Sequence, residues 1–287
     1  MPKQKKEKKK KRKRTKEVVR DRHRLYSASV QSVEADLDFF QRVYKRKRGK
    51  PFTNLREDFC GTAVLACEFV RRKRKNHAVG IDLDRKTLDW GRKRYVPVLG
   101  DAAERLTLIE GDVLDPAHAK ADVVAALNFS YSVFKTRDQL RDYFSSARRG
   151  LEPGGIFFLD AFGGSEAMEE DEEDRKIPAS KAFDGKRVPK FTYVWEQAAF
   201  NPVDHDILCH IHFKLGDGTR IRRAFTYDWR FWTLPEIQEL MLEAGFSDTE
   251  VYVEGWDDEE DDTDGIFRRR KRFENQAGWV AYVVGLT

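Results

Sequence analysis

Two patterns of apolar and polar residues alternate between residues 54 and 160: short apolar runs and stretches with a helical period. Five short apolar runs predict β-strands, at 54–59, 77–82, 106–110, 122–128 and 155–160. Amphipathic stretches with a helical period predict helices between them, at 63–73, 84–94 and 136–150, with a short turn at 116–120. Strands that alternate with crossovers are typical of a doubly wound, mainly parallel sheet.

The pattern changes on both sides of this block. Apolar positions 33, 37, 40 and 44 predict a preceding helix that ends at Gly49 and Pro51. Residues 165–186 hold eight acids and predict a mobile loop. Three alternating runs then predict an antiparallel meander, at 190–200, 206–215 and 219–229. The chain continues with a helix at 234–244, a strand at 248–254, an acidic loop at 257–264, a basic run at 268–272 and an apolar strand at 278–285.

Charge is concentrated at the start of the chain. Residues 1–24 carry 14 Lys/Arg and 3 Asp/Glu, whereas the whole chain of 287 residues has a net charge of +5, so the remainder is mildly acidic. Like-charge repulsion and the lack of apolar residues predict that residues 1–24 form a disordered polybasic tail. The run Lys8–Arg14 suits phosphate binding and resembles a nuclear-import signal; the alternative is an arm folded back on the acidic loops at 169–174 and 257–264.

Cysteine spacing and hydropathy exclude several classes of protein. Cys60, Cys67 and Cys209 show neither paired nor CxxC spacing, which argues against a disulfide framework and a zinc site. The chain contains no apolar run of membrane-spanning length and no secretory leader behind its basic start. We therefore expect a cytoplasmic protein without a membrane partner, with nuclear import as the alternative that the Lys/Arg run raises.

Carboxylates follow the ends of the first two predicted strands. Glu57 and Asp58 precede a tight turn at Gly61, and Asp82 ends the next strand 21 residues later. An acid about 20 residues beyond a Gly turn has the spacing that holds a ribose through its hydroxyls. The sequence therefore predicts a nucleoside cofactor. The alternatives are an ordinary strand-to-helix turn at Gly61 and a surface carboxylate at Asp82, while Asp84 is placed to cap the following helix.

Four segments in this order resemble the class I S-adenosylmethionine (SAM)-dependent methyltransferases. The resemblance covers roughly residues 54–164 and 234–287, and its motifs are 57–63, Asp82, 109–113 (Ile-Glu-Gly-Asp-Val) and 126–131 (Ala-Leu-Asn-Phe-Ser-Tyr). The first motif departs from the family's loop at Phe59 and Ala63, where the family usually has Gly. A nicotinamide dehydrogenase would instead need Gly-x-Gly-x-x-Gly, of which residues 59–64 supply one glycine.

The resemblance implies a role for each matching residue. Glu57 would hold the methionine end of SAM, Asp82 both ribose hydroxyls, Asp112 the adenine amino group, and the backbone of Val113 the adenine ring. The residues Arg56, Cys60, Gly61 and Leu83 complete the predicted cofactor site. Asn128 would lie beside the transferred methyl and orient the acceptor together with Tyr131, although both prolines of the Asn-Pro-Pro-Tyr motif of nucleobase-amine methylators are absent. The alternative for Asn128 is a turn cap.

The resemblance also implies the fold: a seven-stranded, Rossmann-like, doubly wound and mainly parallel sheet with an antiparallel last strand and a small antiparallel β insert. The predicted parts are the tail (1–24), a SAM-binding core (25–164), an acidic loop with a meander that caps the substrate (165–232), and the rest of the core (233–287). We expect a SAM-dependent methyltransferase with a small-molecule acceptor. The alternatives are an RNA or protein methyltransferase recruited by the basic tail, or a non-catalytic nucleic-acid-binding module.

The meander contributes two further groups of candidate residues. His210 and His212 share one strand face, but no third ligand accompanies them, so we expect a solvated face and no metal. Residues 227–232 are rich in aromatic side chains that would wall a pocket or pack in the core. From this segment we predict that Trp229 and Arg230 contact the substrate.

Overall fold

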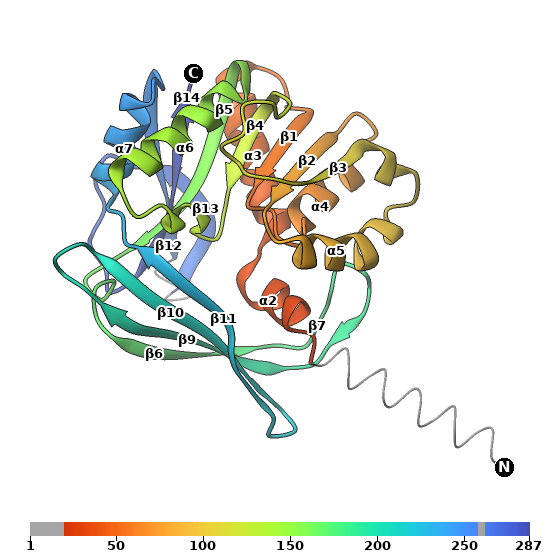
Figure 1. Cartoon of the computed structure of the whole chain (residues 1–287), viewed down its shortest axis with the longest axis vertical. Coiled ribbons are helices and arrows are strands. Elements are labelled where there is room, and N and C mark those ends of the chain that lie inside the picture. Colours follow the sequence, from red (N-terminus) through yellow and green to blue (C-terminus); the bar gives the residue numbers. More distant parts are fainter. Residues whose placement is uncertain (1–19, 258–261) are drawn as a thin grey trace. The chain divides into compact units, whose positions relative to one another are not determined.

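The computed structural model describes residues 20–257 and 262–287 (Figure 1). The chain forms two compact units. One comprises Ser32–Glu169, Asn201–Asp206 and Trp229–Thr287, and the other comprises the chain up to Gln31, Glu170–Phe200 and Ile207–Asp228. Most of the predicted tail, including Lys8–Arg14, and residues 258–261 of the predicted acidic loop lie outside the described residues.

An eight-stranded sheet forms the centre of the larger unit. Its strands are β1 (Asn54–Asp58), β2 (His77–Asp82), β3 (Leu106–Glu110), β4 (Ala121–Ala126), β5 (Leu151–Gly163), β12 (Asp248–Asp257), β13 (Asp262–Arg269) and β14 (Trp279–Leu286). They follow the order β13-β12-β14-β5-β4-β1-β2-β3. Strands β1 to β5 are parallel, and β14 is antiparallel to both β5 and β12. The predicted doubly wound sheet with an antiparallel last strand is confirmed.

The prediction of seven strands is wrong by one edge strand. The sequence predicts an acidic loop at 257–264 and a basic run at 268–272, but residues 262–269 form β13, which pairs antiparallel with β12. An edge strand pairs on one side only and needs no alternating apolar pattern, so charged residues there conceal it.

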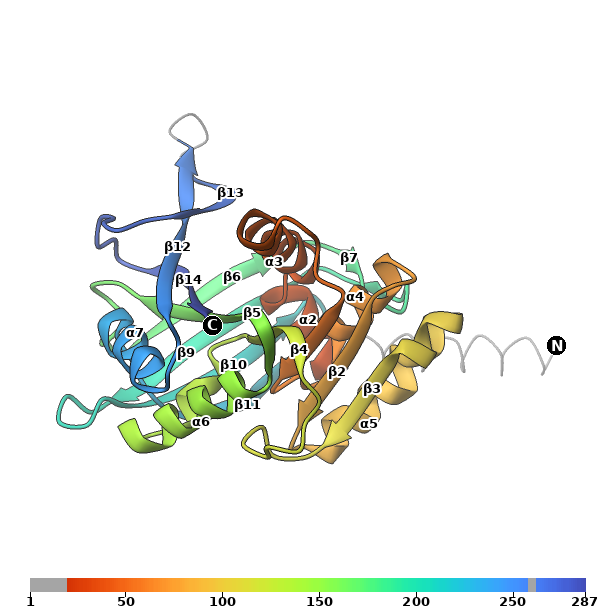
Figure 2. The same cartoon turned by 90° about the horizontal axis from the view of Figure 1, so that it is seen from above.

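Helices cover both faces of the large sheet. They are α3 (Val33–Arg48), α4 (Val64–Arg72), α5 (Arg85–Arg94), α6 (Arg137–Arg149) and α7 (Leu234–Glu243), with short 3-10 turns η1 (Val96–Val98), η2 (Gly100–Arg105) and η3 (Ser130–Val133). Figure 2 shows α6 and α7 on one face and α3 on the other. Capping boxes start both α6 and α7: Thr136 with Gln139, and Thr233 with Glu236.

Consecutive residues of β5 carry the two halves of the core. Phe158 stacks on Phe40 of α3 with ring centroids 4.3 Å apart, whereas Phe157 packs against Phe144 of α6 on the opposite face. All four side chains are fully buried. Because β5 is buried on both faces, it reads in the sequence as a continuous apolar run.

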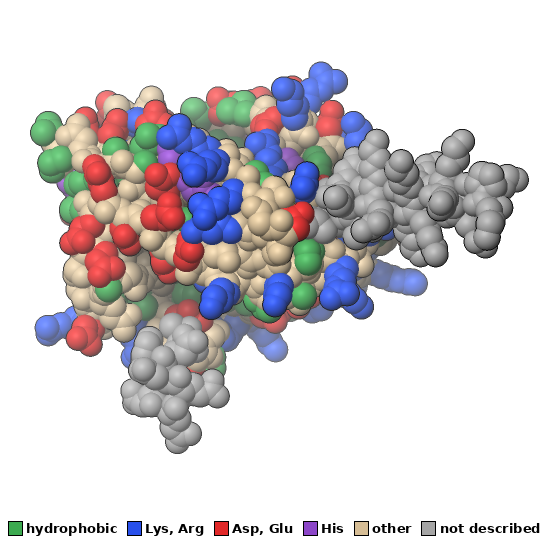
Figure 3. Space-filling model, turned by 90° about the horizontal axis from the view of Figure 1, so that it is seen from below, with side chains coloured by type: hydrophobic (Ala, Val, Ile, Leu, Met, Phe, Trp, Pro, Cys, Tyr) green, Lys and Arg blue, Asp and Glu red, His purple; other side chains and the backbone are tan. Residues whose placement is uncertain are grey.

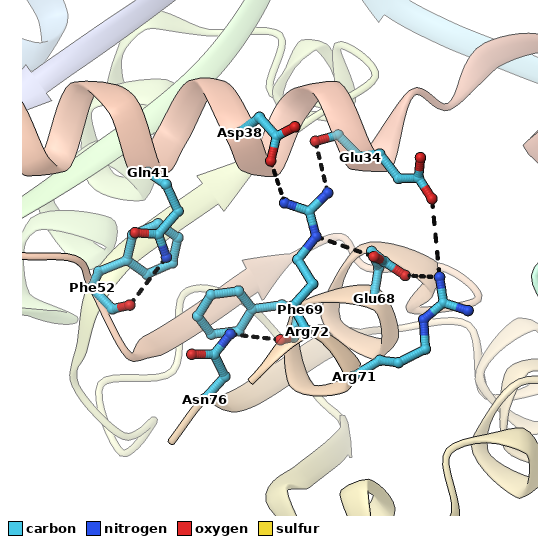
Figure 4. A network of polar contacts seen from close by, with 9 residues as sticks. All are labelled: Glu34, Asp38, Gln41, Phe52, Glu68, Phe69, Arg71, Arg72 and Asn76. Atoms are coloured by element: carbon cyan, nitrogen blue, oxygen red, sulfur yellow. Dashed lines mark hydrogen bonds and ion pairs between the residues drawn. The ribbon is translucent and has the colours of Figure 1, made fainter. Parts of the chain in front are cut away.

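A polar network holds α3 against α4 (Figure 4). The guanidinium of Arg72 donates to the Asp38 carboxylate at 2.5 Å, to the Glu34 carbonyl at 2.9 Å and to Glu68 at 3.1 Å. Arg71 forms a second ion pair with Glu68. These bonds fix the helix that precedes β1 to the helix that follows it.

The smaller unit is built on the predicted meander. Its elements are α2 (Arg22–Val30), β6 (Asp171–Ile177), the short pair β7 (Ser180–Lys181) and β8 (Arg187–Val188), β9 (Phe191–Phe200), β10 (Asp206–Leu215) and β11 (Arg220–Arg230). The four-stranded sheet has the order β11-β10-β9-β6. The predicted role of residues 165–232 as a substrate cap stays a prediction.

Two sequence expectations are wrong in this unit. The mobile loop predicted at 165–186 contains the edge strand β6, which pairs with β9 and whose Asp174 forms an ion pair with Lys214 at 2.8 Å. The tail predicted to end at residue 24 gives way to α2 at Arg22, because the Asp21 side chain caps this helix. Arg24 is buried between Asp21 and Asp184.

The histidine pair of β10 does not form the solvated face that the sequence predicts, because His210 is only 3% exposed and His212 is half-buried. His212 hydrogen-bonds Glu196 at 2.7 Å and His210 hydrogen-bonds Thr226 at 2.9 Å. Histidines also lie beside Lys and Arg side chains in the view of Figure 3. Across the described residues, no cluster of three or more His, Cys, Asp or Glu is arranged to hold a metal ion. No helix in the same residues combines the length and apolar character needed to cross a membrane.

Candidate functional site at the carboxyl edge of the sheet

Polar residues follow the carboxyl ends of the parallel strands along one edge of the larger sheet. In strand order these are Asp160 on β5, Asn128 after β4, Glu57 on β1, Asp82 on β2 and Asp112 after β3. The sheet reverses its winding between β4 and β1, and such a switch point opens a crevice at this edge. The fold therefore places Glu57, Asp82, Asp112 and Asn128 of the predicted site along a single edge.

Glu57 lies under the first turn of α4. Its Oε2 accepts a hydrogen bond from the Ala66 backbone N–H at 2.9 Å and thereby replaces the cap that Ala63 cannot supply. Burial raises the pKa of the Glu57 carboxyl to about 8. Its Oε1 receives no hydrogen bond from another described residue, so one carboxylate oxygen is left for a ligand.

The turn between β1 and α4 is wound through three left-handed residues. Phe59, Gly61 and Ala63 have φ angles of 55°, 54° and 57°. A residue with a Cβ pays roughly 1–2 kcal/mol for this conformation, so the backbone keeps a glycine-loop shape without glycine at positions 59 and 63. Strain of this kind is often retained where a ligand site needs it.

Asp82, at the end of the neighbouring strand β2, stabilises this turn by hydrogen bonds. Its carboxylate accepts the Gly61 N–H at 2.7 Å and the Asp84 N–H at 2.8 Å. Each oxygen retains a second lone pair, and the side chain is only half-buried, so two further donors can still be accepted. Burial also raises the pKa of Asp82. Asp84 caps α5, as the sequence predicts.

Arg56 belongs to the interior of the protein. Strand alternation places Arg56 and Asp58 on the face opposite Glu57, and Arg56 Nε donates to Asp58 at 2.6 Å. Arg56 also donates to the Val113 carbonyl at 3.0 Å, and the Tyr143 hydroxyl donates to Asp58 at 3.1 Å. The Arg56 side chain is thus committed to a buried network that ties β1 to α6, a role that its charge alone did not reveal.

The other predicted cofactor residues differ in accessibility. Cys60 is 2% exposed and its sulfur fills the space beside Gly80, which lacks a Cβ. Burial raises the pKa of the Cys60 thiol well above its usual range. Leu83 is 70% exposed and Asp112 is exposed, whereas the Val113 side chain is buried. Leu83 and Asp112 are therefore open to a ligand, whereas the Cys60 thiol is enclosed by the protein.

Asp160 holds the turn that presents Asn128. Its two carboxylate oxygens accept the backbone N–H groups of Asn128 at 2.7 Å and Phe129 at 2.9 Å. Both of these residues have φ of 57°. The half-buried side-chain amide of Asn128 makes no hydrogen bond to another described residue. Its donor and acceptor are consequently both available at the end of β4.

Aromatic rings line the chain next to Asn128. Phe129 lies 4.8 Å from Phe162 and 6.5 Å from Trp229, ring centre to ring centre. Trp229 is therefore brought close to the residue that follows Asn128. Arg230 instead stacks over Trp232 at 3.9 Å and pairs with Glu236 at 3.2 Å, so its guanidinium already has partners within the larger unit.

Tyr131 does not reach the opening as expected. It is 1% exposed and lies within the core between β4, α6 and α7. The reason is local: two left-handed residues are followed by the 3-10 turn η3, which directs Tyr131 inward rather than along the edge. Burial raises the pKa of its hydroxyl well above the usual range.

One polar pair at this edge was not predicted. The Tyr282 hydroxyl of β14 donates to Asp36 of α3, and Tyr282 is the register partner of Asp160 across the β5–β14 ladder. Burial raises the pKa values of Asp36 to about 6 and of Asp160 to about 7. Asp36 and Tyr282 are 246 residues apart in the sequence. Apolar periodicity carries no information about a contact between such distant residues, so no signal in the sequence could have identified the pair.

The donor and acceptor set of this edge fits SAM. The free oxygen of Glu57 and the remaining lone pairs of Asp82 match the ammonium group of the methionine end and the ribose hydroxyls, respectively. Gly91 of α5 lets the turn approach closely, because a Cβ there would lie 2.3 Å from the Thr62 carbonyl oxygen. No residue of this edge contradicts the nucleoside cofactor.

Comparison with known proteins finds a family model that matches part of the chain. Residues 59–155 match the family described as "Methyltransferase domain". No curated protein matches the sequence.

Solved structures of similar fold cover most of the chain. A SAM-dependent methyltransferase from Clostridium acetobutylicum has a TM-score of 0.62 at 15% identity, over 90% of this chain and 95% of that one. The SAM-bound amino pentose methyltransferase CalS10 from Micromonospora echinaspora has a TM-score of 0.61 at 15% identity, over 90% and 94%. The sugar N-methyltransferase KedS8 from Streptoalloteichus has 0.58 at 15% identity, over 91% and 90%. Likeness at this identity concerns the fold.

Proposed function

We propose that this chain, a class I SAM-dependent methyltransferase by its family domain and its fold, methylates a small-molecule acceptor beside Asn128. The observation that carries the proposal is the carboxamide of Asn128, which has no hydrogen-bond partner among the described residues and whose backbone N–H is held at the switch-point edge by Asp160. Sugar and amino pentose methyltransferases among the proteins of similar fold are consistent with a small acceptor.

On the cofactor side, we assign Glu57 to the methionine end of SAM and Asp82 to its ribose. Gly61 and Leu83 would lie against the cofactor, and Asp112 with the Val113 backbone would meet the adenine. Arg56 and Cys60 would act through the shape of the turn, since their side chains are buried. When bound, SAM supplies an activated methyl group, so the protein mainly has to align the acceptor and exclude water.

On the acceptor side, the Asn128 amide would orient the nucleophile by one hydrogen bond. Phe129, Phe162 and Trp229 would supply the apolar wall that keeps water out, and Arg230 would position this wall through its stack on Trp232. An amine or hydroxyl acceptor must lose a proton. The carboxyl groups of Asp36 and Asp160, whose pKa values lie near neutrality, are the groups of this edge suited to accept it.

The acceptor class is tested by supplying methyl-labelled SAM and the full chain to a cell extract that has been separated by size. We expect label in the small-molecule fraction. Label confined to the RNA or protein fraction would replace this proposal with the alternative of a macromolecular acceptor. An absence of label from every fraction, together with intact SAM binding, would instead favour a non-catalytic module.

A further inference from the structure

Two runs of cations lie far apart in the sequence and contain no acid. Residues 42–50, the second half of α3 and the turn after it, carry six Lys/Arg, and residues 268–272, the end of β13 and the segment after it, carry five. We call these eleven cations the basic surface: Arg42, Lys45, Arg46, Lys47, Arg48, Lys50, Arg268, Arg269, Arg270, Lys271 and Arg272. Eight of them are exposed, and the other three are half-buried.

The fold brings the two runs together. Arg42 donates to the Phe267 carbonyl at 2.9 Å, across 225 residues of sequence. Lys47 from the first run and Arg269 from the second both pair with Glu250 of β12, at 2.7 and 2.9 Å. One buried carboxylate therefore anchors both runs. Burial would raise the pKa of Glu250, but its hydrogen bonds to Lys47 and Tyr252 and its attraction to Arg269 lower the pKa overall, so Glu250 remains charged.

The nearby acids leave most of this charge uncompensated. Within the described residues, Glu250 takes two of the cations and Asp264 pairs with Arg268.

We propose that the basic surface binds the phosphate backbone of a nucleic acid. Seven of its eleven cations are Arg, whose planar fork suits bidentate contact with phosphate. The cations follow two linear runs, which matches a linear polyanion. Phe273, 37% exposed, adjoins the second run and offers a ring for base stacking. This binding is separate from the methyl-transfer site, so it requires neither the proposed acceptor nor turnover.

The test replaces Arg270, Lys271 and Arg272 together by Ser in the full chain and measures the affinity for a fluorescent DNA duplex of mixed sequence. These exposed residues form no ion pair with another described residue, so the variant should fold and melt as the parent protein does. Loss of three phosphate contacts should weaken binding about tenfold or more and reduce the slope of log K against log salt by about 2 to 3.

The matched control replaces Lys73, Arg74 and Lys75 by Ser, which removes the same charge from an exposed turn elsewhere on the larger unit. The control should keep the parent affinity and salt slope, and the polybasic tail contributes equally to both variants. Equal affinities and slopes for the two variants would overturn the proposal. So would loss of binding to phosphatidylserine vesicles with unchanged duplex binding, which would assign the surface to a membrane.

Discussion

The hydrogen bond and the burial of Glu57 shift its pKa in opposite directions. It accepts the Ala66 N–H under the positive end of α4, which favours the charged form, but burial costs more and raises its pKa to about 8. In the ligand-free protein this side chain is therefore neutral near pH 7. A cationic ligand beside the free oxygen would favour ionisation, so the proposed contact with the ammonium group of SAM would change the charge of Glu57.

The raised pKa has a stability consequence of definite sign. The pKa of Glu57 is higher in the folded state than in the unfolded state. Its contribution to the free energy of unfolding is therefore fully present below about pH 4.5 and is lost as the pH rises through about 8. Between pH 6 and pH 9 we expect the free energy of unfolding of the ligand-free protein to fall by about 2 to 3 kcal/mol because of Glu57. Glu57→Gln should reduce the fall of the melting temperature between about pH 6 and pH 9. The same substitution at the exposed Glu104 should leave that fall unchanged. Parallel profiles for Glu57→Gln and the parent would refute this account of Glu57.

Asp82 and Asp84 allow cofactor contact to be separated from helix capping. Asp82→Ala should weaken SAM binding about tenfold or more in calorimetry, since two charge-assisted hydrogen bonds are removed. Asp84→Ala removes the α5 cap and should cost about 1 kcal/mol of stability while changing SAM affinity little. Equal loss of SAM affinity in both variants would mean that Asp82 acts only by bracing the turn.

At the scale of elements, the sequence predicts strands well where apolar residues form a run or alternate, and poorly where charged residues fill an edge strand. The strands β1 to β5 alternate with helices, so their apolar runs are distinct. Of the four missed strands, β7 and β8 are only two residues long, and β6 and β13 are edge strands whose charged side chains hide the strand pattern. Their backbones are ordered by a neighbour distant in the chain, which local pattern does not encode.

The start of α2 gives a prediction at the same scale. Deleting residues 1–19 should leave the unfolding midpoint in denaturant nearly unchanged, because that stretch has little apolar surface to bury. Deleting residues 1–24 also removes the Asp21 cap and Arg24, and leaves Asp184 buried without its cation. We expect the second deletion to cost about 3 kcal/mol or more. Equal midpoints for both deletions would show that the helix start adds no stability.

At the scale of the whole molecule, the site is partly readable from the sequence. The ends of parallel strands must meet at one edge, so Glu57, Asp82 and Asn128 could be placed together from the pattern alone. The conformation of the turn after β4 could not be predicted from the pattern. Phe129 adopts a left-handed φ only because Asp160 holds its N–H, and this turn sends Tyr131 into the core. Such a reversal depends on tertiary hydrogen bonds, which residue spacing does not reveal.

The most direct test of the account is methyl transfer from labelled SAM by Asn128→Ala and by Tyr131→Phe, each compared with the parent on the same acceptor fraction. We predict that Asn128→Ala lowers turnover more than tenfold with SAM affinity nearly retained, because an orienting contact is lost. Tyr131→Phe should keep turnover, because the hydroxyl is buried. Full turnover by Asn128→Ala would contradict the placement of the acceptor beside β4.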